Sequence, residues 1–381
     1  MLKTDKRVIL AVAGSGKTYY ICNNINENSR NIIIAYTNQN IKNIINELTK
    51  KYGHIPDNTL VMTFHSFIYK FMIRPFDNAI GEFYGVSNFV SKGVSIISPP
   101  VPSIKLPDGN YRKNHNYFPI STLNHFHKEH KYYSDYLSKL ILRVKNRKLS
   151  LINMACNNLN KFFDYIYIDE MQDFREDNWK LLLEIIKRVN NILLVGDYNQ
   201  HSVSALNNHG IPFQVGKKYI GYENYKVNLS KLGLNVDETS LLKSRRCSKE
   251  ICEFIQKKLN INIESNEINF GHIIYLDDET EIIKILNNDK VMKLVWEKPE
   301  NYSFVSNSWS YSKGDTYENT CIILTDKYDN LDKDNFSMPN SVISVNKLYV
   351  ALTRSKGNVY IIKKAIFDSL NIKIENEQII F

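Results

Sequence analysis

Short apolar runs of strand-forming side chains recur along this chain of 381 residues, and polar or glycine-rich turns follow them. Residues 7–12 form one such run, and residues 18–25 then carry a pattern that suits the start of a helix. Two further runs, at residues 165–168 and 192–195, have the continuous apolar character of buried strands. Buried strands that alternate with helical patterns predict an α/β fold built on parallel sheets.

The turn after the first predicted strand reads AVAGSGKT at residues 11–18. A strand, a glycine-rich turn and a helix are the context that a phosphate-binding loop requires, because glycines let backbone N–H groups face the phosphates. Lys17 would reach the β- and γ-phosphates of ATP, and the Thr18 hydroxyl would ligate Mg²⁺. The alternative is a glycine-rich turn that arose by chance. The expected nucleotide-binding residues of the loop are Ala13, Gly14, Ser15, Gly16, Lys17 and Thr18.

Two later strands end in polar residues that fit the same chemistry. The run at 165–168 is followed by Asp169 and Glu170, and ligands of parallel sheets bind at this carboxyl edge. Asp169 would hold Mg²⁺ through water, and Glu170 would orient and deprotonate the attacking water. The alternative is that these acids cap a helix. The run at 192–195 ends in GDYNQ, where Gln200 could sense the γ-phosphate.

With these pieces in order, the chain resembles the UvrD/Rep-like superfamily 1 DNA helicases, whose loop typically reads AGAGSGKT. Ala11 agrees with that form and Val12 departs from it. TFHSF, DEMQD and VALTR are each fairly specific to the family. The segments that resemble its other motifs are AYTNQN (35–40), TFHSF (63–67), DEMQDF (169–174), GDYNQ (196–200), LLKSRRCS (241–248), SWSYSKGDTYENT (308–320) and LYVALTRSK (348–356).

The resemblance implies two RecA-like P-loop NTPase domains, with parallel sheets flanked by helices and ATP bound between them. The implied arrangement is a first domain (1A) at 1–68 and 159–208, an inserted basic and aromatic subdomain (1B) at 69–158, and a second domain (2A) at 209–381. Arg246 and Arg354 would reach the γ-phosphate, where a guanidinium stabilises the charge of the transferring phosphoryl group. Arg245 would lie against the adenine base of ATP. For both catalytic arginines the alternative is a surface ion pair.

The resemblance also implies a track for single-stranded DNA across both domains. Its candidate residues are Tyr36, Thr37, Thr63, Phe64, His65, Ser308 and Lys313. Aromatic faces stack on bases without reading their sequence, and hydroxyl groups bind phosphate oxygens. Phe64 could equally belong to the core.

Charge adds a second region to this picture. The formal net charge is +9, and residues 104–150 contain ten basic and three acidic side chains interleaved with seven tyrosines and phenylalanines. This stretch falls in the implied 1B insert, where it suits attraction to a nucleic-acid backbone and base stacking. A solvated basic face over an ordinary aromatic core is the alternative. Three of its histidines, His125, His127 and His130, lie close together in the sequence but lack the further ligands that a metal site needs.

Four departures from the family pattern limit what the resemblance implies. The N-terminal glutamine that reads adenine is missing, and Arg245 replaces the tyrosine that packs on the base. Val203, Ala205 and Leu206 occupy the places of the motif III residues that engage single-stranded DNA. Between motifs IV and V, only about 50 residues lie from Ile255 to Ser306, too few for an independent domain 2B, so we expect a compact form without it.

The sequence therefore predicts an enzyme that uses ATP and Mg²⁺ to move along single-stranded DNA or a single-strand/duplex junction, with family-like 3′-to-5′ polarity. A nucleotide-gated DNA-binding regulatory subunit of a nuclease or replication complex is the alternative, and an RNA helicase is a third possibility. A protein partner could supply the contacts with DNA that this chain lacks. Five scattered cysteines favour a reducing compartment, and no apolar run is long enough to span a membrane, so we expect a cytoplasmic protein.

Overall fold

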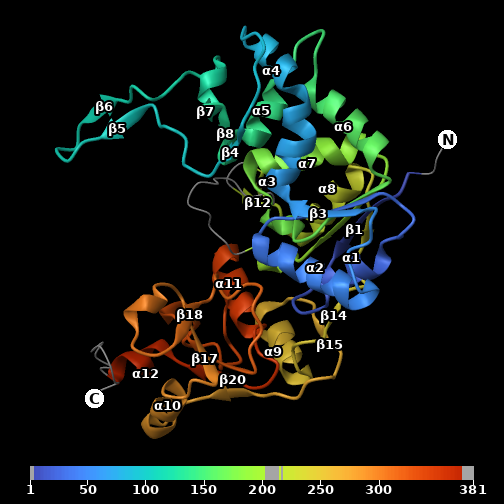
Figure 1. Ribbon diagram of the computed structural model, residues 1–381. Coiled ribbons are helices and arrows are strands. Elements are labelled where there is room, and N and C mark those ends of the chain that lie inside the picture. Colours follow the sequence, from blue (N-terminus) through green and yellow to red (C-terminus); the bar gives the residue numbers. More distant parts are fainter. Residues whose placement is uncertain (1–3, 202–213, 216–217, 371–381) are drawn as a thin grey trace. The chain divides into compact units, whose positions relative to one another are not determined.

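The computed structural model describes residues 4–201, 214–215 and 218–370 (Figure 1). The chain divides into two compact units, which are described in turn. The described part of the first unit comprises residues 4–8, 21–194, 214–215 and 218–236, and that of the second comprises 9–20, 195–201 and 237–370. The predicted boundary at 208–209 and the motif III positions Val203, Ala205 and Leu206 lie outside the described residues.

A six-stranded sheet forms the centre of the first unit, and the four strands β10, β9, β2 and β3 pair in parallel. All five residues of β2 and of β10 are buried, as their continuous apolar sequences NIIIA and ILLVG require. The strands predicted at 165–168 and 192–195 are confirmed, and so is the α/β fold. In sheet order the strands are β13 (Asn235–Asp237), β1 (Lys6–Leu10), β10 (Ile192–Gly196), β9 (Tyr165–Ile168), β2 (Asn31–Ala35) and β3 (Thr59–Thr63).

Amphipathic helices cover this sheet. In α7 (Glu176–Arg188) an apolar stripe that includes Leu181 and Ile185 is buried, while acids occupy its first turn and bases its last turn. These charges oppose the partial charges of the helix ends and stabilise the helix. The other helices of this unit are α2 (Asn38–Tyr52), α3 (Phe64–Phe67), α4 (Asp77–Phe83), α5 (Leu137–Arg143), α6 (Leu151–Phe162) and α8 (Gly221–Lys231), while α1 (Lys17–Asn24) begins at the end of the phosphate loop.

The segment between α4 and α5 forms the central part of the basic and aromatic insert predicted at 69–158. A small sheet of β4 (Gly93–Ser95), β8 (Lys131–Tyr133) and β7 (His127–Lys128) forms its base, and the hairpin β5 (Ser103–Lys105)–β6 (Tyr111–Lys113) reaches away from that base (Figure 1). Phe126 and Tyr132 are fully buried, and the buried Asp77 carboxylate accepts hydrogen bonds from Tyr132 and from Ser91. Tyr111 is exposed on the hairpin. The insert therefore has an ordinary aromatic core and carries most of its basic side chains outside it.

The second unit is built on an all-parallel sheet of five strands. Two of these strands, β16 and β17, come from the interval between motifs IV and V, so that interval contributes to the sheet. The sheet order is β16 (Ile273–Tyr275), β20 (Val359–Ile362), β19 (Asn319–Ile323), β17 (Val291–Val295) and β18 (Ser306–Ser308). The remaining elements are β14 (Lys243–Ser244), β15 (Glu264–Ser265), α9 (Lys249–Leu259), α10 (Glu279–Leu286), α11 (Val342–Leu352) and α12 (Lys364–Ser369).

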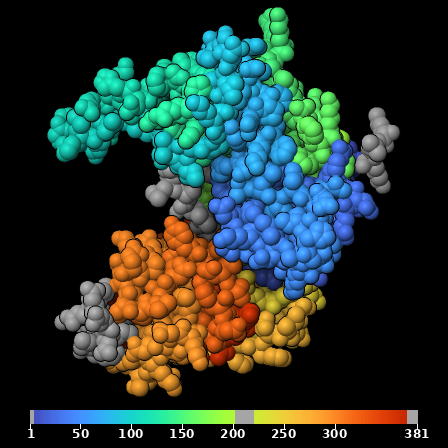
Figure 2. Space-filling model, viewed as in Figure 1, coloured from blue at the N-terminus to red at the C-terminus, as the bar shows by residue number. Residues whose placement is uncertain are grey.

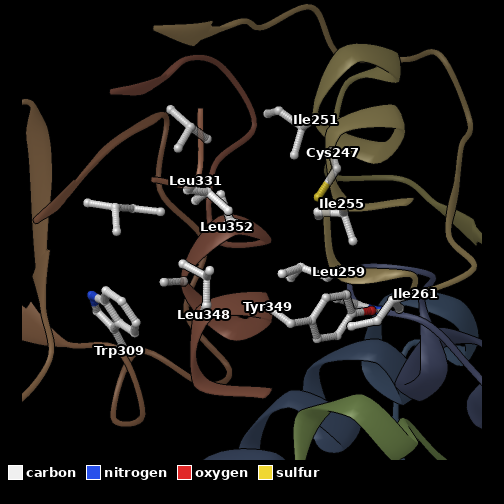
Figure 3. Close-up of a cluster of buried hydrophobic side chains, with 14 of the residues drawn as sticks. Cys247, Ile251, Ile255, Leu259, Ile261, Trp309, Leu331, Leu348, Tyr349 and Leu352 are labelled. Carbon is white, nitrogen blue, oxygen red and sulfur yellow. The ribbon is translucent and has the colours of Figure 1, made fainter. Parts of the chain in front are cut away.

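Helices α9 and α11 pack on each other over this sheet and enclose an apolar cluster (Figure 3). Ile251, Ile255 and Leu348 are fully buried in it, together with Trp309, whose indole Nε1 donates to the Leu294 carbonyl at 3.1 Å. Burying such side chains is the main source of stability of a domain. In the part of the chain that the structure describes, no helix has both the length and the apolar surface that crossing a lipid bilayer demands.

Two glycines of this unit touch backbone to backbone. A Cβ atom added at Gly271 would lie 2.1 Å from the carbonyl oxygen of Gly357. We predict that Gly271→Ala lowers the free energy of unfolding by about 1–3 kcal/mol or more, because a backbone atom cannot rotate out of the way. Urea unfolding followed by circular dichroism measures the change. The exposed Ser303→Ala is the control, and an unchanged midpoint for Gly271→Ala would contradict the close approach.

Candidate nucleotide site and nucleic-acid track

The phosphate loop joins β1 to α1 in the conformation that anion binding requires. Gly14 and Gly16 both have left-handed backbone angles, with φ of 71° and 87°. Alternation of such residues turns successive N–H groups toward one point, which makes a nest for an anion. A Cβ atom at Gly14 would lie 2.7 Å from the Cβ of Arg246, so glycine is needed there for space as well. The Ser15 hydroxyl donates to the Val12 carbonyl at 2.8 Å and closes the turn.

A buried tyrosine links the loop to motif III. The Ala13 N–H donates to the Tyr349 hydroxyl at 2.9 Å, and that hydroxyl donates to Asp197 Oδ2 at 3.2 Å. Burial raises the pKa of Tyr349, and the nearby Asp197 carboxylate raises it further, so the phenol remains a donor. The sequence analysis missed both residues, although each stands inside a motif that it quoted, LYVALTR and GDYNQ.

Arg354 follows α11 and is buried, with only 1% of its surface exposed. Its guanidinium donates to the carbonyls of Val350, Ser312 and Asp315 and to the Thr353 hydroxyl. All these partners are neutral oxygens, and within the described ranges no carboxylate forms an ion pair with Arg354. The predicted alternative of a surface ion pair is therefore wrong for Arg354.

Burial, and to a smaller extent the neighbouring Arg246 guanidinium, lower the pKa of Arg354 to about 9. Arg246 lies against Gly14, and its Nη1 donates to the Thr353 carbonyl at 3.0 Å. A cation removed from water beside a second cation raises the free energy of the folded state, and an arriving anion would lower it. This part of the second unit is therefore suited to bind a phosphate group.

The remaining nucleotide residues of the second unit lie around the same loop. Arg245 donates its N–H to the Gly14 carbonyl at 2.9 Å, and its exposed guanidinium lies over the Tyr19 ring, 5.0 Å from the ring centre. Asn269 fixes this segment by donating to the Arg245 carbonyl at 2.8 Å. Gln200 is buried in the single helical turn Tyr198–Gln200, where its N–H donates to the Asp197 carbonyl.

The two carboxylates of motif II belong to the first unit, directly after β9. Asp169 is buried, and its N–H donates to the Ile34 carbonyl at 2.9 Å. Glu170 has a left-handed backbone, with φ of 54°, and its own N–H donates to Asp169 Oδ1 at 2.9 Å. Such strain in a residue other than glycine is typical of functional positions. Gln172, which the sequence analysis did not select, donates to the Glu170 carboxylate and orients it.

Glu170 precedes the short helical turn Met171–Asp173 but makes no side-chain cap hydrogen bond there, so the capping alternative fails for this residue. The structure thus brings together the loop, Gln200 and the three arginines within the second unit. The approach of Asp169 and Glu170 to Lys17 and Thr18 stays a prediction.

The candidate track residues of motifs Ia and Ib meet in an aromatic cluster in the first unit. The Tyr36 ring lies edge-on to His65, with ring centres 5.6 Å apart, and its hydroxyl accepts from Asn178 at 3.1 Å. Tyr36 and His65 are partly exposed. Thr37 accepts the Asn40 N–H and caps α2, and Thr63 caps α3 in the same way.

Two of the predicted contacts do not fit the observed burial. Phe64 is 0% exposed and packs on Phe174 with ring centres 4.5 Å apart, so it belongs to the core and cannot stack on a base in this structure. Ser308 is buried too, and its Oγ accepts the Tyr311 N–H at 3.1 Å. Tyr311 itself is 76% exposed, two residues before the partly exposed Lys313. It is the aromatic residue that the sequence analysis missed in motif V.

Two protein families match this chain. Residues 1–205 match the family described as an AAA domain, and residues 121–363 match the viral superfamily 1 RNA helicase core domain. Each match covers more than half of the chain. This protein belongs to the superfamily 1 helicases. No curated protein matches it in sequence. Members of this superfamily are nucleotide-hydrolysing enzymes, and the membership agrees with the two parallel sheets and with the phosphate loop.

Solved helicase structures of arteriviruses are similar to this superfamily 1 chain at low identity. The helicase of PRRSV has 10% identity and a TM-score of 0.45, with 94% of this chain and 52% of that chain covered. An arterivirus nonstructural protein 10 helicase in complex with DNA has 11% identity and a TM-score of 0.44, with 96% and 62% covered. The chain therefore spans about half to three fifths of the length of these helicases.

We predict that Arg354→Gln lowers the turnover number for ATP by about 10³-fold or more, the lower range for a guanidinium that stabilises a transferring phosphoryl group. Binding of a fluorescent ADP analogue should change far less. Phosphate release and fluorescence titration measure the two effects, and circular dichroism verifies the fold.

The exposed Arg74→Gln serves as the matched control for this substitution. A folded Arg354→Gln protein that hydrolyses ATP at the rate of the wild type would show that Arg354 only supports the structure.

Proposed function

We propose that this superfamily 1 helicase is an ATP-dependent translocase on single-stranded DNA that acts at single-strand/duplex junctions with 3′-to-5′ polarity. The observation that carries the proposal is the buried Arg354, whose hydrogen-bond partners are neutral oxygens and which adjoins Arg246 against the phosphate loop. Such a site favours an arriving phosphate and disfavours an empty state. Nucleotide binding would thus relieve an electrostatic cost of the second unit.

In the proposed reaction the N–H groups of the loop and Lys17 bind the phosphates of ATP. Thr18 and Asp169 would hold Mg²⁺, which neutralises charge on the β- and γ-phosphates. Glu170 accepts the proton of the attacking water, and Gln172 keeps the Glu170 carboxylate oriented. Gln200 contacts the γ-phosphate, and Arg246 and Arg354 stabilise the charge that develops on it.

Along the nucleic acid, the residues that support the proposal are Tyr36, Thr37, Thr63 and His65 in the first unit and Lys313 in the second, with Tyr311 added. Exposed aromatic rings stack on bases of any sequence, so this set suits movement along a strand. The short interval between motifs IV and V supplies strands of the second sheet, which agrees with a compact helicase without domain 2B. A nuclease or replication factor that binds this protein would then supply further contacts with duplex DNA.

Two other functions are each favoured by a specific observation. The second family match is named for RNA helicases, so RNA is the second candidate for the strand. Arg245 stands in place of the usual base-packing tyrosine, which favours a nucleotide-gated binding subunit that hydrolyses ATP poorly. DNA is retained as the first proposal because DEMQD and TFHSF resemble the DNA-specific branch.

We predict that single-stranded DNA stimulates ATP turnover and that Glu170→Gln lowers the stimulated rate by about 10²-fold or more, because the water loses its base. Phosphate release is measured with oligo(dT) and oligo(U) of equal length. The exposed Glu82→Gln should behave like the wild type.

Stronger stimulation by oligo(U) would replace DNA with RNA in the proposal. Equal and negligible turnover in the wild type and Glu170→Gln, in the presence of either strand, would replace the motor by the gated subunit.

We also predict that the protein displaces streptavidin from a biotin at the 5′ end of single-stranded DNA faster than from one at the 3′ end. A 3′-to-5′ motor runs toward the 5′ end and pushes the block off. Gel analysis at saturating ATP measures both rates, and Glu170→Gln controls for spontaneous release. Faster release from the 3′ end would reverse the assigned polarity.

A further inference from the structure

A cationic pocket lies in the first unit, between α5, the start of α7 and the end of the basic insert. Its volume is about 530 Å³, within the usual range for ligand pockets. Four cations line it, and the Phe83 ring contributes to an apolar part of its wall. The four cations are Lys139, Arg143, Lys145 and Lys180.

One acid, Asp177, also lines the pocket, and it forms an ion pair with Lys180 at 3.0 Å. The cations thus outnumber the acids by three, and no site residue discussed above lines this pocket. Arg143, Lys145 and Lys180 are exposed to solvent. Like charges that face one space without neutralisation attract an anionic ligand.

The pocket is joined to the candidate track by hydrogen bonds. Ser138 donates to Asn178 Oδ1 at 2.6 Å, and Asn178 Nδ2 donates to the Tyr36 hydroxyl at 3.1 Å. Ser138 and Asn178 directly adjoin Lys139 and Asp177, two residues of the pocket. Helices α5 and α7 pack against each other, so these bonds fix the pocket relative to Tyr36 (Figure 1).

Figure 2 shows the basic and aromatic insert, drawn in cyan to green, on the surface of this unit. The pocket opens to solvent, its cations are long and flexible, and no described group provides a buried donor that would read a particular base. This chemistry suits a repeating anionic backbone, whose phosphates bind lysine and arginine regardless of sequence.

We infer that the pocket binds the phosphodiester backbone of the nucleic acid, as a second contact region beyond the motif Ia and Ib track. The inference rests on the proposed function only for the class of ligand. It requires no ATP hydrolysis, because the contact is electrostatic and exists in the protein without nucleotide.

The test measures binding without nucleotide, by fluorescence anisotropy with labelled single-stranded and duplex oligonucleotides at several salt concentrations. Each lysine or arginine that stops contacting a phosphate should reduce the slope of log K against log salt by about 0.7 for a single strand and about 0.9 for a duplex. For Lys139→Gln/Arg143→Gln we expect the slope to fall by about twice one of these amounts. The oligonucleotide, single-stranded or duplex, whose slope falls in this variant identifies which form occupies the pocket.

Asp177→Asn provides a change of opposite sign. It removes the single acid of the pocket, so we expect tighter binding at low salt. The matched control is Lys50→Gln/Lys161→Gln, two exposed lysines of the same unit on α2 and α6, which removes the same charge outside the pocket. Thermal unfolding verifies that each variant is folded.

A slope and an affinity for Lys139→Gln/Arg143→Gln equal to those of the control pair would overturn the inference. Weaker binding by Asp177→Asn would overturn it too. Failure of the ATPase prediction would leave these binding results unaffected, so the two proposals fail separately.

Discussion

Two guanidinium groups that approach each other next to the phosphate loop are the constraint on which the rest of this structure depends. Arg354 is buried among neutral oxygens, and Arg246 beside it lies against Gly14. Like charges at short range in a region with little water are costly, and burial together with the neighbouring Arg246 guanidinium lowers the pKa of Arg354 to about 9. Hydrogen bonds to carbonyl oxygens of α11 and motif V hold Arg354 in place, the Asp197 carboxylate offsets part of this cost, and a bound anion would offset more.

The sheets and the apolar cluster position the charged residues that would act on phosphate. The five-stranded sheet and the packing of α9 on α11 hold motifs IV and VI at fixed positions, so Arg246 and Arg354 both reach Thr353. In the first unit the six-stranded sheet places Asp169 and Glu170 at the carboxyl end of β9. Each unit thus supports charges that act on phosphate, and buried, mainly apolar strands such as β10 in the first unit and β20 in the second lie in its sheet.

Much of this could be predicted from the sequence, because the signals were local. The strands at 165–168 and 192–195 are short apolar runs that end in acids, and AVAGSGKT places its glycines where only a left-handed backbone fits. Long-range contacts were not predictable. Tyr349 lies 336 residues from its partner Ala13, and no neighbouring residue in the sequence indicates the hydrogen bond between them. Phe64 failed for a related reason, because a phenylalanine beside a surface motif reads the same whether it faces solvent or the core.

The Tyr349 hydroxyl has a mechanical consequence. One oxygen atom accepts a hydrogen bond from the Ala13 N–H of the loop and donates a hydrogen bond to Asp197 at the end of β10. A displacement of the loop that breaks the hydrogen bond from Ala13 therefore leaves the Tyr349 hydroxyl bonded to the Asp197 carboxylate. Helix α11, which carries the tyrosine, then loses one of its hydrogen bonds to the rest of the unit. Because Arg354 follows the same helix, the Tyr349 hydroxyl joins the phosphate loop to the element that carries the guanidinium.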